Sequence, residues 1–239
     1  MDIKMGSALL LSLFIFPTNC VAGVKDKRAA VIAAPELRRL ILQTPINSPL
    51  HQELMSRASH SHLMDVAYVQ YSELWRRKPG DAYANLLRGV SAEYLELGKA
   101  NPDTKKFYSQ ATTDDLLSVA ASSFARAVEL DPKAAIVNLE SGYFLWQFGN
   151  KLPQGLAQLR KASQLVPNNV RVHATWGLVY ENPYGGVYNM KKAVDELNLA
   201  ISLDPTYAYP HNLLANIYTR LKQPVKAEQE RRRYQSLLP

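Results

Sequence analysis

Apolar residues recur at helical spacing along almost the whole chain. From about position 48 onward they return every three or four residues, and no stretch alternates apolar and polar residues as a strand would. A shorter segment before it places Leu37, Leu40 and Ile41 on one helical face. The pattern therefore predicts an all-α protein in which a short helix over 35–42 precedes a long helical region.

The helices of the long region are predicted to come in pairs, because one phrase recurs. Its clearest form is Ala120-x3-Phe124-x2-Ala127-x4-Pro132. Similar phrases end at prolines separated by 53, 35, 38 and 34 residues, so three separations lie near 34 and the first is 34 plus 19. A period of this length is typical of stacked helix pairs. The prolines are Pro79, Pro132, Pro167, Pro205 and Pro239.

Small residues at fixed places in each pair predict where its two helices cross. Two helices approach to about 8–10 Å only where the side chains between them allow it. The first helices carry a small residue near the middle, and the second helices carry one opposite. These residues are Gly89, Gly142, Gly177 and Ala215 in the first helices, and Ala120, Gly155, Ala193 and Ala227 in the second.

These phrases resemble the tetratricopeptide repeat (TPR) family. The likeness lies in Trp176-Gly177-x2-Tyr180, in the phrase that ends at Pro132, and in Asn212-x-Leu214-Ala215-x2-Tyr218. It covers about 48–239. The resemblance implies a right-handed α-solenoid of about five TPR-like helix pairs with an N-terminal capping helix. The first pair departs most from the family pattern, with Met55 and Leu74 where a small residue is usual.

The expected repeats are interrupted twice. About 98–115 would be an insertion between the helices of the second pair, and Gly98 is expected as a turn residue and Thr112 with Asp115 as a helix N-cap. A shorter insertion follows Asn182 in the fourth pair. Such insertions are either neutral surface loops or extensions of a binding surface. The repeats are predicted at about 48–81, 82–132, 135–167, 170–205 and 208–239.

Residues 1–22 have the pattern of a cleavable signal peptide. Lys4 precedes the apolar run 8–16, and small side chains end at Ala22. That run is too short to span a bilayer, which needs about 20 residues. A buried N-terminal helix is the alternative. We expect a segment over 23–47 with one helix, and export to the periplasm of a bacterium or secretion. The residues before Cys20 differ from a lipoprotein site, so no lipoprotein is expected.

Composition and charge add little evidence for chemistry. The 239 residues carry a net charge of +7, but the basic residues are spread thinly and the one dense run is Arg231 to Arg233. We therefore expect no nucleic-acid partner. His60 and His62 stand two apart, which is a poor chelate on a helix. We therefore predict that the protein is not an enzyme and that it needs no cofactor or metal.

The first helix of each TPR pair lines the concave groove, so a binding function is expected there. The alternatives are a protein or peptide segment held by a scaffold, for example in the assembly of an envelope machine, and a small molecule held by a component of a periplasmic solute uptake system. Several of the aromatic residues could instead belong to the core between repeats. The helical wheel gives the groove-facing set Tyr83, Glu93, Tyr94, Tyr143, Trp146, Gln147, Arg171, Glu181, Asn182, Tyr209, Asn212, Asn216 and Arg220.

Overall fold

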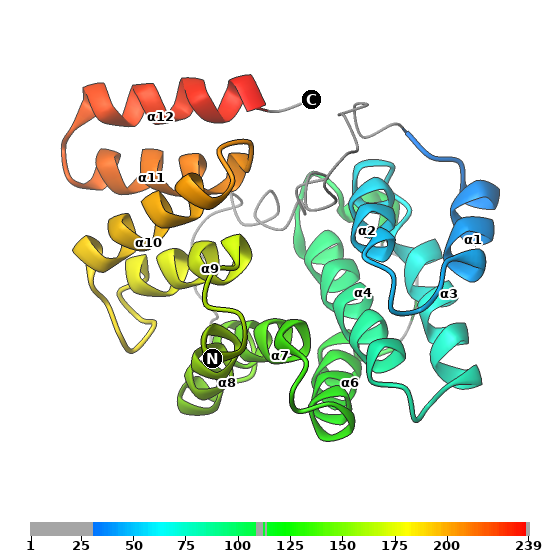
Figure 1. Ribbon diagram of the computed structural model, residues 1–239. Helices are drawn as coiled ribbons and strands as arrows, with labels where there is room; N and C mark the ends of the chain where they lie inside the picture. The colour runs from blue at the N-terminus through cyan, green and yellow to red at the C-terminus, as the bar shows by residue number, and fades with distance from the viewer. Residues whose placement is uncertain (1–30, 109–111, 113, 238–239) are drawn as a thin grey trace. The chain divides into compact units, whose positions relative to one another are not determined.

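The computed structural model describes residues 31–108, 112 and 114–237, which form two compact units that divide after Leu130 (Figure 1). Within these residues every regular element is a helix, and there are twelve of them. This confirms the predicted all-α class and its helix pairs. The predicted signal peptide, with Cys20 and the cleavage site at Ala22, lies outside the described residues.

The first unit holds six helices. They are α1 (Ala34–Gln43), α2 (Leu50–His60), α3 (Met64–Arg77), α4 (Ala82–Ala100), α5 (Lys105–Tyr108) and α6 (Leu116–Leu130). In this unit α1 packs on α3, α3 on α4, and α4 on α6. Leu37 and Ile41 of α1 are fully buried, so α1 covers the end of the stack as a capping helix would.

Gly89 lies at the crossing of α4 and α6, as the spacing of small residues predicts. Asp81 caps α4 by accepting a hydrogen bond from the amide of Ala84. A methyl group added at Gly89 would lie 3.1 Å from the ring of Phe124, which is buried. The absence of a side chain at Gly89 therefore lets the phenylalanine of α6 lie directly against the backbone of α4.

The insertion after α4 begins later than predicted and packs back onto the unit. Gly98 is predicted in a turn, but α4 continues through it to Ala100. Tertiary packing explains why the helix continues through Gly98. The buried ring of Tyr108 lies so close to Gly98 that an added Cβ would be 2.7 Å from it. Further along, the Tyr68 hydroxyl donates to Oδ2 of Asp114 at 2.6 Å. Asp115, rather than Thr112, accepts from a backbone amide of α6.

The second unit consists of three helix pairs. They are α7 (Ala135–Gln147) with α8 (Leu152–Leu165), α9 (Val170–Glu181) with α10 (Met190–Leu203), and α11 (Ala208–Arg220) with α12 (Pro224–Leu237). Packing of α8 and α10 against the following first helices, and of α9 against α11, joins the pairs. Asn169 and Asn189 cap α9 and α10 through their side-chain oxygens.

Glycines set the closest approach between α7 and α8. A Cβ at Gly155 would lie 2.6 Å from the backbone nitrogen of Trp146, and one at Gly142 would lie 2.9 Å from that of Leu159. In the next pair a Cβ at Gly177 would meet the side chain of Leu197 at 2.5 Å. Backbone lies against backbone in the first case, so only glycine fits there without a shift of a whole helix.

A second sequence regularity accompanies the prolines. In each helix pair a histidine or asparagine stands six residues after a proline, and in four of the five pairs its side chain bonds the carbonyl oxygen of that proline. His211 occupies the same place after Pro205, but its Nδ1 lies 2.6 Å from Oε2 of Glu230. The carbonyl bonds, of 3.1, 2.9, 3.0 and 2.8 Å, join His51 to Pro45, Asn85 to Pro79, Asn138 to Pro132 and His173 to Pro167.

These bonds tie the start of a first helix to the loop before it. The loop carbonyl would otherwise have no partner in the helix, and an unpaired buried backbone oxygen costs free energy. The first helices are therefore held at a fixed angle to the loops that connect the pairs. Of the helices in the described ranges, none is long and apolar enough to cross a membrane.

Candidate binding face

The predicted groove residues divide between the two units. Tyr83, Glu93 and Tyr94 lie on α4 of the first unit, where Glu93 is buried and the two tyrosines are half-buried. All others belong to the second unit, on α7, α9 and α11 or, for Asn182, at the end of α9. The larger set of predicted groove residues is therefore that of the second unit.

The aromatic residues of α7 are part of the packing of the second unit. Tyr143 and Trp146 are only 5% and 6% exposed. The Trp146 indole nitrogen donates to the carbonyl oxygen of Gly185 at 3.2 Å. Replacement of these two side chains is therefore expected to destabilise the unit, so it is not a clean test of binding. Gln147 is half-buried at the end of α7.

Arg171 is also buried, in an ion pair that sequence reasoning missed. Its Nη2 contacts Oε1 of Glu140, and both side chains are less than one tenth exposed. The pair joins α7 to α9, the first helices of successive repeats. A buried charge is tolerated when it is paired in this way. The available signal was Glu140 itself, the one charged residue of α7, in the middle of that helix.

Four predicted residues form a stripe along α11, which we call the α11 stripe. Tyr209, Asn212, Asn216 and Arg220 follow one another at intervals of three or four residues, so they share one face of the helix. Tyr209 is buried, the two asparagines are half-buried, and the Arg220 side chain is 41% exposed. Neither asparagine side chain bonds another described residue, so their amides are available to a ligand.

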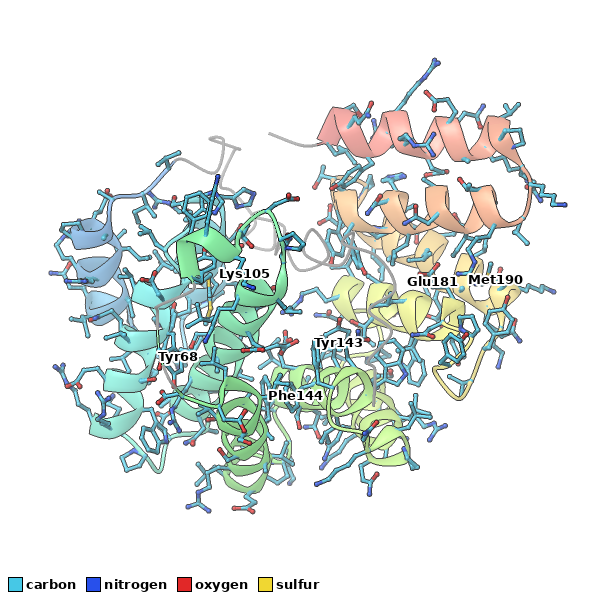
Figure 2. All side chains as sticks on the ribbon, turned by 180° about the vertical axis from the view of Figure 1, so that it is seen from behind. Tyr68, Lys105, Tyr143, Phe144, Glu181 and Met190 are labelled. Carbon is cyan, nitrogen blue, oxygen red and sulfur yellow. The ribbon has the colours of Figure 1, made fainter. Side chains whose placement is uncertain are left out.

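Glu181, labelled in Figure 2, is the last residue of α9, and Arg220 of the α11 stripe lies close to it. Arg220 Nη1 donates to the backbone oxygen of Glu181 at 3.2 Å and lies 3.7 Å from its carboxylate Oε2. Burial raises the pKa of this carboxyl to about 7, and the nearby Arg220 charge offsets the rise only in part.

The short insertion after α9 is a fixed loop. Asn182 Oδ1 accepts from the amide of Tyr184, and the amide of Asn189 closes the loop on the carbonyl of Tyr180. Gly186 has φ +79°, and a Cβ there would lie 2.4 Å from the Leu152 side chain. The loop therefore packs on α8, and it supplies the carbonyl that Trp146 bonds.

The side chains of the α11 stripe are better suited to hydrogen bonding than to catalysis. Amides and a guanidinium form hydrogen bonds with peptide groups and carboxylates, and none of them is a nucleophile at neutral pH. Across the described ranges, no three His, Cys, Asp or Glu side chains are grouped so that they could hold a metal ion. His60 and His62 do not meet, since His60 bonds the carbonyl of Ser56 and His62 stacks on Phe107.

Comparison with known proteins identifies the fold. No protein-family model matches the chain, and no curated protein sequence does. Two solved structures of MamA match with a TM-score of 0.50 each. A double mutant is 18% identical over 87% of this chain and 96% of that one, and residues 41 to the end of MamA from Desulfovibrio magneticus RS-1 are 17% identical over 87% and 97%. The chain has a TPR-type fold.

A third solved structure, of YrrB, is described as a TPR protein with an unusual peptide-binding site. It is 19% identical, covers 74% of this chain and 97% of its own, and has a TM-score of 0.33. At these identities the likenesses inform the fold alone. A fold does not by itself give a function, so any partner has to be argued from the side chains of this chain.

Proposed function

We propose that the protein is a non-enzymatic scaffold that binds an extended segment of a partner protein along the α11 stripe. The observation that carries the proposal is the pair of half-buried asparagines, one helical turn apart, with Arg220 a further turn on. Four residues of helix rise about 6 Å, close to the roughly 6.6–6.8 Å between alternate residues of an extended chain. The amides of Asn212 and Asn216 can thus meet alternate peptide groups of one segment.

The polarity of the stripe fits this ligand. An asparagine amide offers both a donor and an acceptor, which is what a peptide group requires. The buried Tyr209 and the Glu140–Arg171 pair hold α11 and α9 in place around it. Rigid support of this kind lowers the entropy that binding would otherwise cost.

Selection from a random peptide library tests the proposal directly, because it needs no natural partner. Peptides selected on the purified protein are measured by fluorescence anisotropy against the wild type and the double variant Asn212→Ala/Asn216→Ala. We expect a loss of affinity of about tenfold or more, since one or two hydrogen bonds are removed. The matched control is Asn198→Ala, an exposed asparagine on α10. Failure to select any peptide, or equal affinity for both proteins, would contradict the proposal.

We propose in addition that the protein acts outside the cytoplasm. The support is the segment before Ala22, with its lysine and short apolar run. Amino-terminal sequencing of the protein isolated from its own cells gives the test. A first residue at Gly23 is expected, and an intact amino terminus in the cytoplasmic fraction would contradict export.

A further inference from the structure

The carboxylate of Glu181 is only partly satisfied. Its Oε2 is buried, yet it accepts no hydrogen bond from the described residues. The side chain as a whole retains 15% exposure, so part of it lies at the edge of solvent. A buried polar oxygen without a donor costs free energy, and a charged one costs more.

Arg220 does not complete this site. Its Nη1 is 3.7 Å from Oε2 and donates to the backbone oxygen of Glu181 instead. The same unit shows what a closed pair looks like, because Arg171 and Glu140 are in direct contact and almost wholly buried. By comparison, the Glu181 carboxylate has capacity left for another donor, and a carboxylate can accept several hydrogen bonds.

The position of Glu181 links this capacity to the α11 stripe. Glu181 and Arg220 end neighbouring first helices, so a segment that follows Asn212 and Asn216 toward Arg220 reaches Glu181 at the end of its path. The raised pKa of Glu181 agrees with a carboxylate that lacks stabilising donors.

We propose that Glu181 recognises a basic side chain, lysine or arginine, of the segment bound along the α11 stripe. A cationic donor satisfies the carboxylate better than a neutral one, because charge-assisted hydrogen bonds are the stronger kind. The carboxylate then bridges two cations, the ligand's and Arg220. This inference rests on the proposed peptide binding and adds the chemistry that selects the peptide.

A double-mutant cycle between protein and ligand tests it. Peptides are selected at pH 8 from the random library, and a selected peptide with lysine or arginine is remade with glutamine at that position. Both peptides are titrated against the wild type and Glu181→Gln. We expect the basic peptide to lose about tenfold in affinity on Glu181→Gln, while the glutamine peptide loses less than about twofold. Glu228→Gln, which removes a carboxylate of α12, is the control.

The outcomes separate the two proposals. Enrichment of lysine and arginine in the wild-type pool, lost in a pool selected on Glu181→Gln, supports the inference. Pools of equal composition, or equal losses for both peptides, overturn it and leave peptide binding standing. Failure to select any peptide on the wild type overturns peptide binding and this inference together. Unfolding curves of each variant show that the protein is folded in every titration.

Discussion

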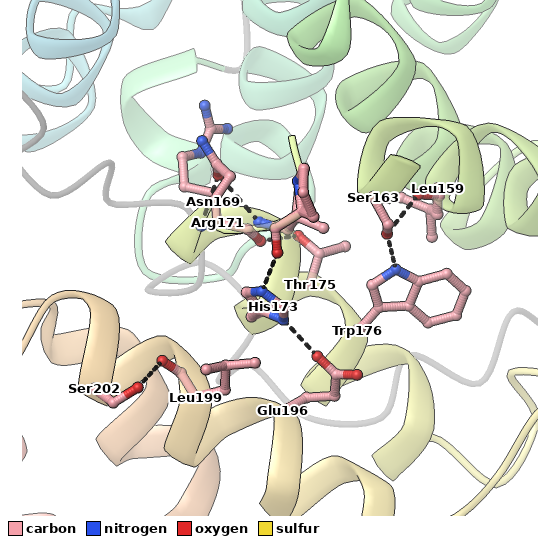
Figure 3. Close-up of polar contacts among 12 residues, drawn as sticks. Leu159, Ser163, Asn169, Arg171, His173, Thr175, Trp176, Glu196, Leu199 and Ser202 are labelled. Carbon is pink, nitrogen blue, oxygen red and sulfur yellow. Dashed lines mark hydrogen bonds and ion pairs between the residues drawn. The ribbon is translucent and has the colours of Figure 1, made fainter. Parts of the chain in front are cut away.

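The ring of His173 lies between two hydrogen-bond acceptors, one of them Glu196. Its Nδ1 is 2.7 Å from Oε2 of Glu196 on α10, and its Nε2 is 2.8 Å from the carbonyl oxygen of Pro167 (Figure 3). A carboxylate and a carbonyl both accept, so the ring satisfies both when it carries a proton on each nitrogen. One side chain thus connects α9, its partner helix and the loop that precedes the pair.

Two substitutions of His173 distinguish how much each of its two hydrogen bonds contributes to stability. Asparagine occupies this place in α4 and α7, where its amide donates to the proline carbonyl and also to the backbone oxygen four residues earlier in the chain. We therefore expect His173→Asn to keep the loop bond, lose the Glu196 bond, and lower the free energy of unfolding by about 1 kcal/mol. His173→Ala loses both bonds, with an expected cost of about 2 kcal/mol. Urea unfolding curves give both values.

Glu196→Ala is the cross-check on the same contact, because it removes the carboxylate that His173 Nδ1 contacts. Its effect should not add to that of His173→Asn, since both variants remove this same bond. Full additivity, or no loss of stability in His173→Ala, would show that this contact contributes nothing to the fold.

The pH dependence of stability should report on Glu181. Its pKa is about 7 in the folded protein against an ordinary value of 4.5, so the folded state holds the proton more strongly. The stabilisation from this proton is complete below about pH 4.5 and is lost as the pH rises through 7. At roughly 1.4 kcal/mol for each pKa unit, the loss is at most about 3.5 kcal/mol.

Glu181→Gln cannot ionise and should not show this loss. We expect the variant to gain stability relative to the wild type as the pH rises from 5 to 8, measured by urea unfolding at each pH. A difference between the two proteins that stays constant over this range would contradict the burial of Glu181 beside Arg220.

Two glycines in different surroundings should respond differently to alanine. An added Cβ at Gly155 would lie 2.6 Å from the backbone of Trp146, whereas Gly80 has nothing within 4 Å. We expect Gly155→Ala to lower the midpoint of thermal unfolding, with a cost of about 1–3 kcal/mol or more. Gly80→Ala should be neutral or slightly stabilising, by up to about 1 kcal/mol. Similar losses in both variants would contradict the tight contact of α7 with α8.

The helix pairs could be predicted because close packing of two helices requires small residues at regular positions in the local sequence. Gly89, Gly142 and Gly177 stand where an added side chain would meet a neighbouring helix or its side chains, and their spacing is visible in one sequence. The bonds from histidine or asparagine to the preceding proline left a trace as well, in the spacing of six residues. These bonds were not predicted from the sequence, because the position is histidine in some pairs and asparagine in others, although both side chains offer a hydrogen-bond donor there.

The candidate face was harder to predict, because a helical wheel gives the side of the helix on which a residue lies but does not show which other residue it contacts. Trp146 was placed on the groove by its phase, but its indole bonds a carbonyl of the loop inserted 39 residues later. Arg171 faces Glu140, 31 residues away on another helix. Gly98 continues a helix because a tyrosine of the insertion packs on it. Contacts of this range depend on tertiary packing that a local pattern does not contain.

Site-specific photo-crosslinking is the most direct test of the central claim, which is that a protein segment binds along the α11 stripe. A photoreactive phenylalanine derivative is placed at Thr219, an exposed residue of α11 three positions after Asn216, or at Leu199, which is 44% exposed on the second helix α10. Each protein is irradiated with a peptide selected on the wild type. We expect a crosslinked product from position 219 and little or none from position 199. Equal yields from both positions, or a product from position 199 alone, would contradict it.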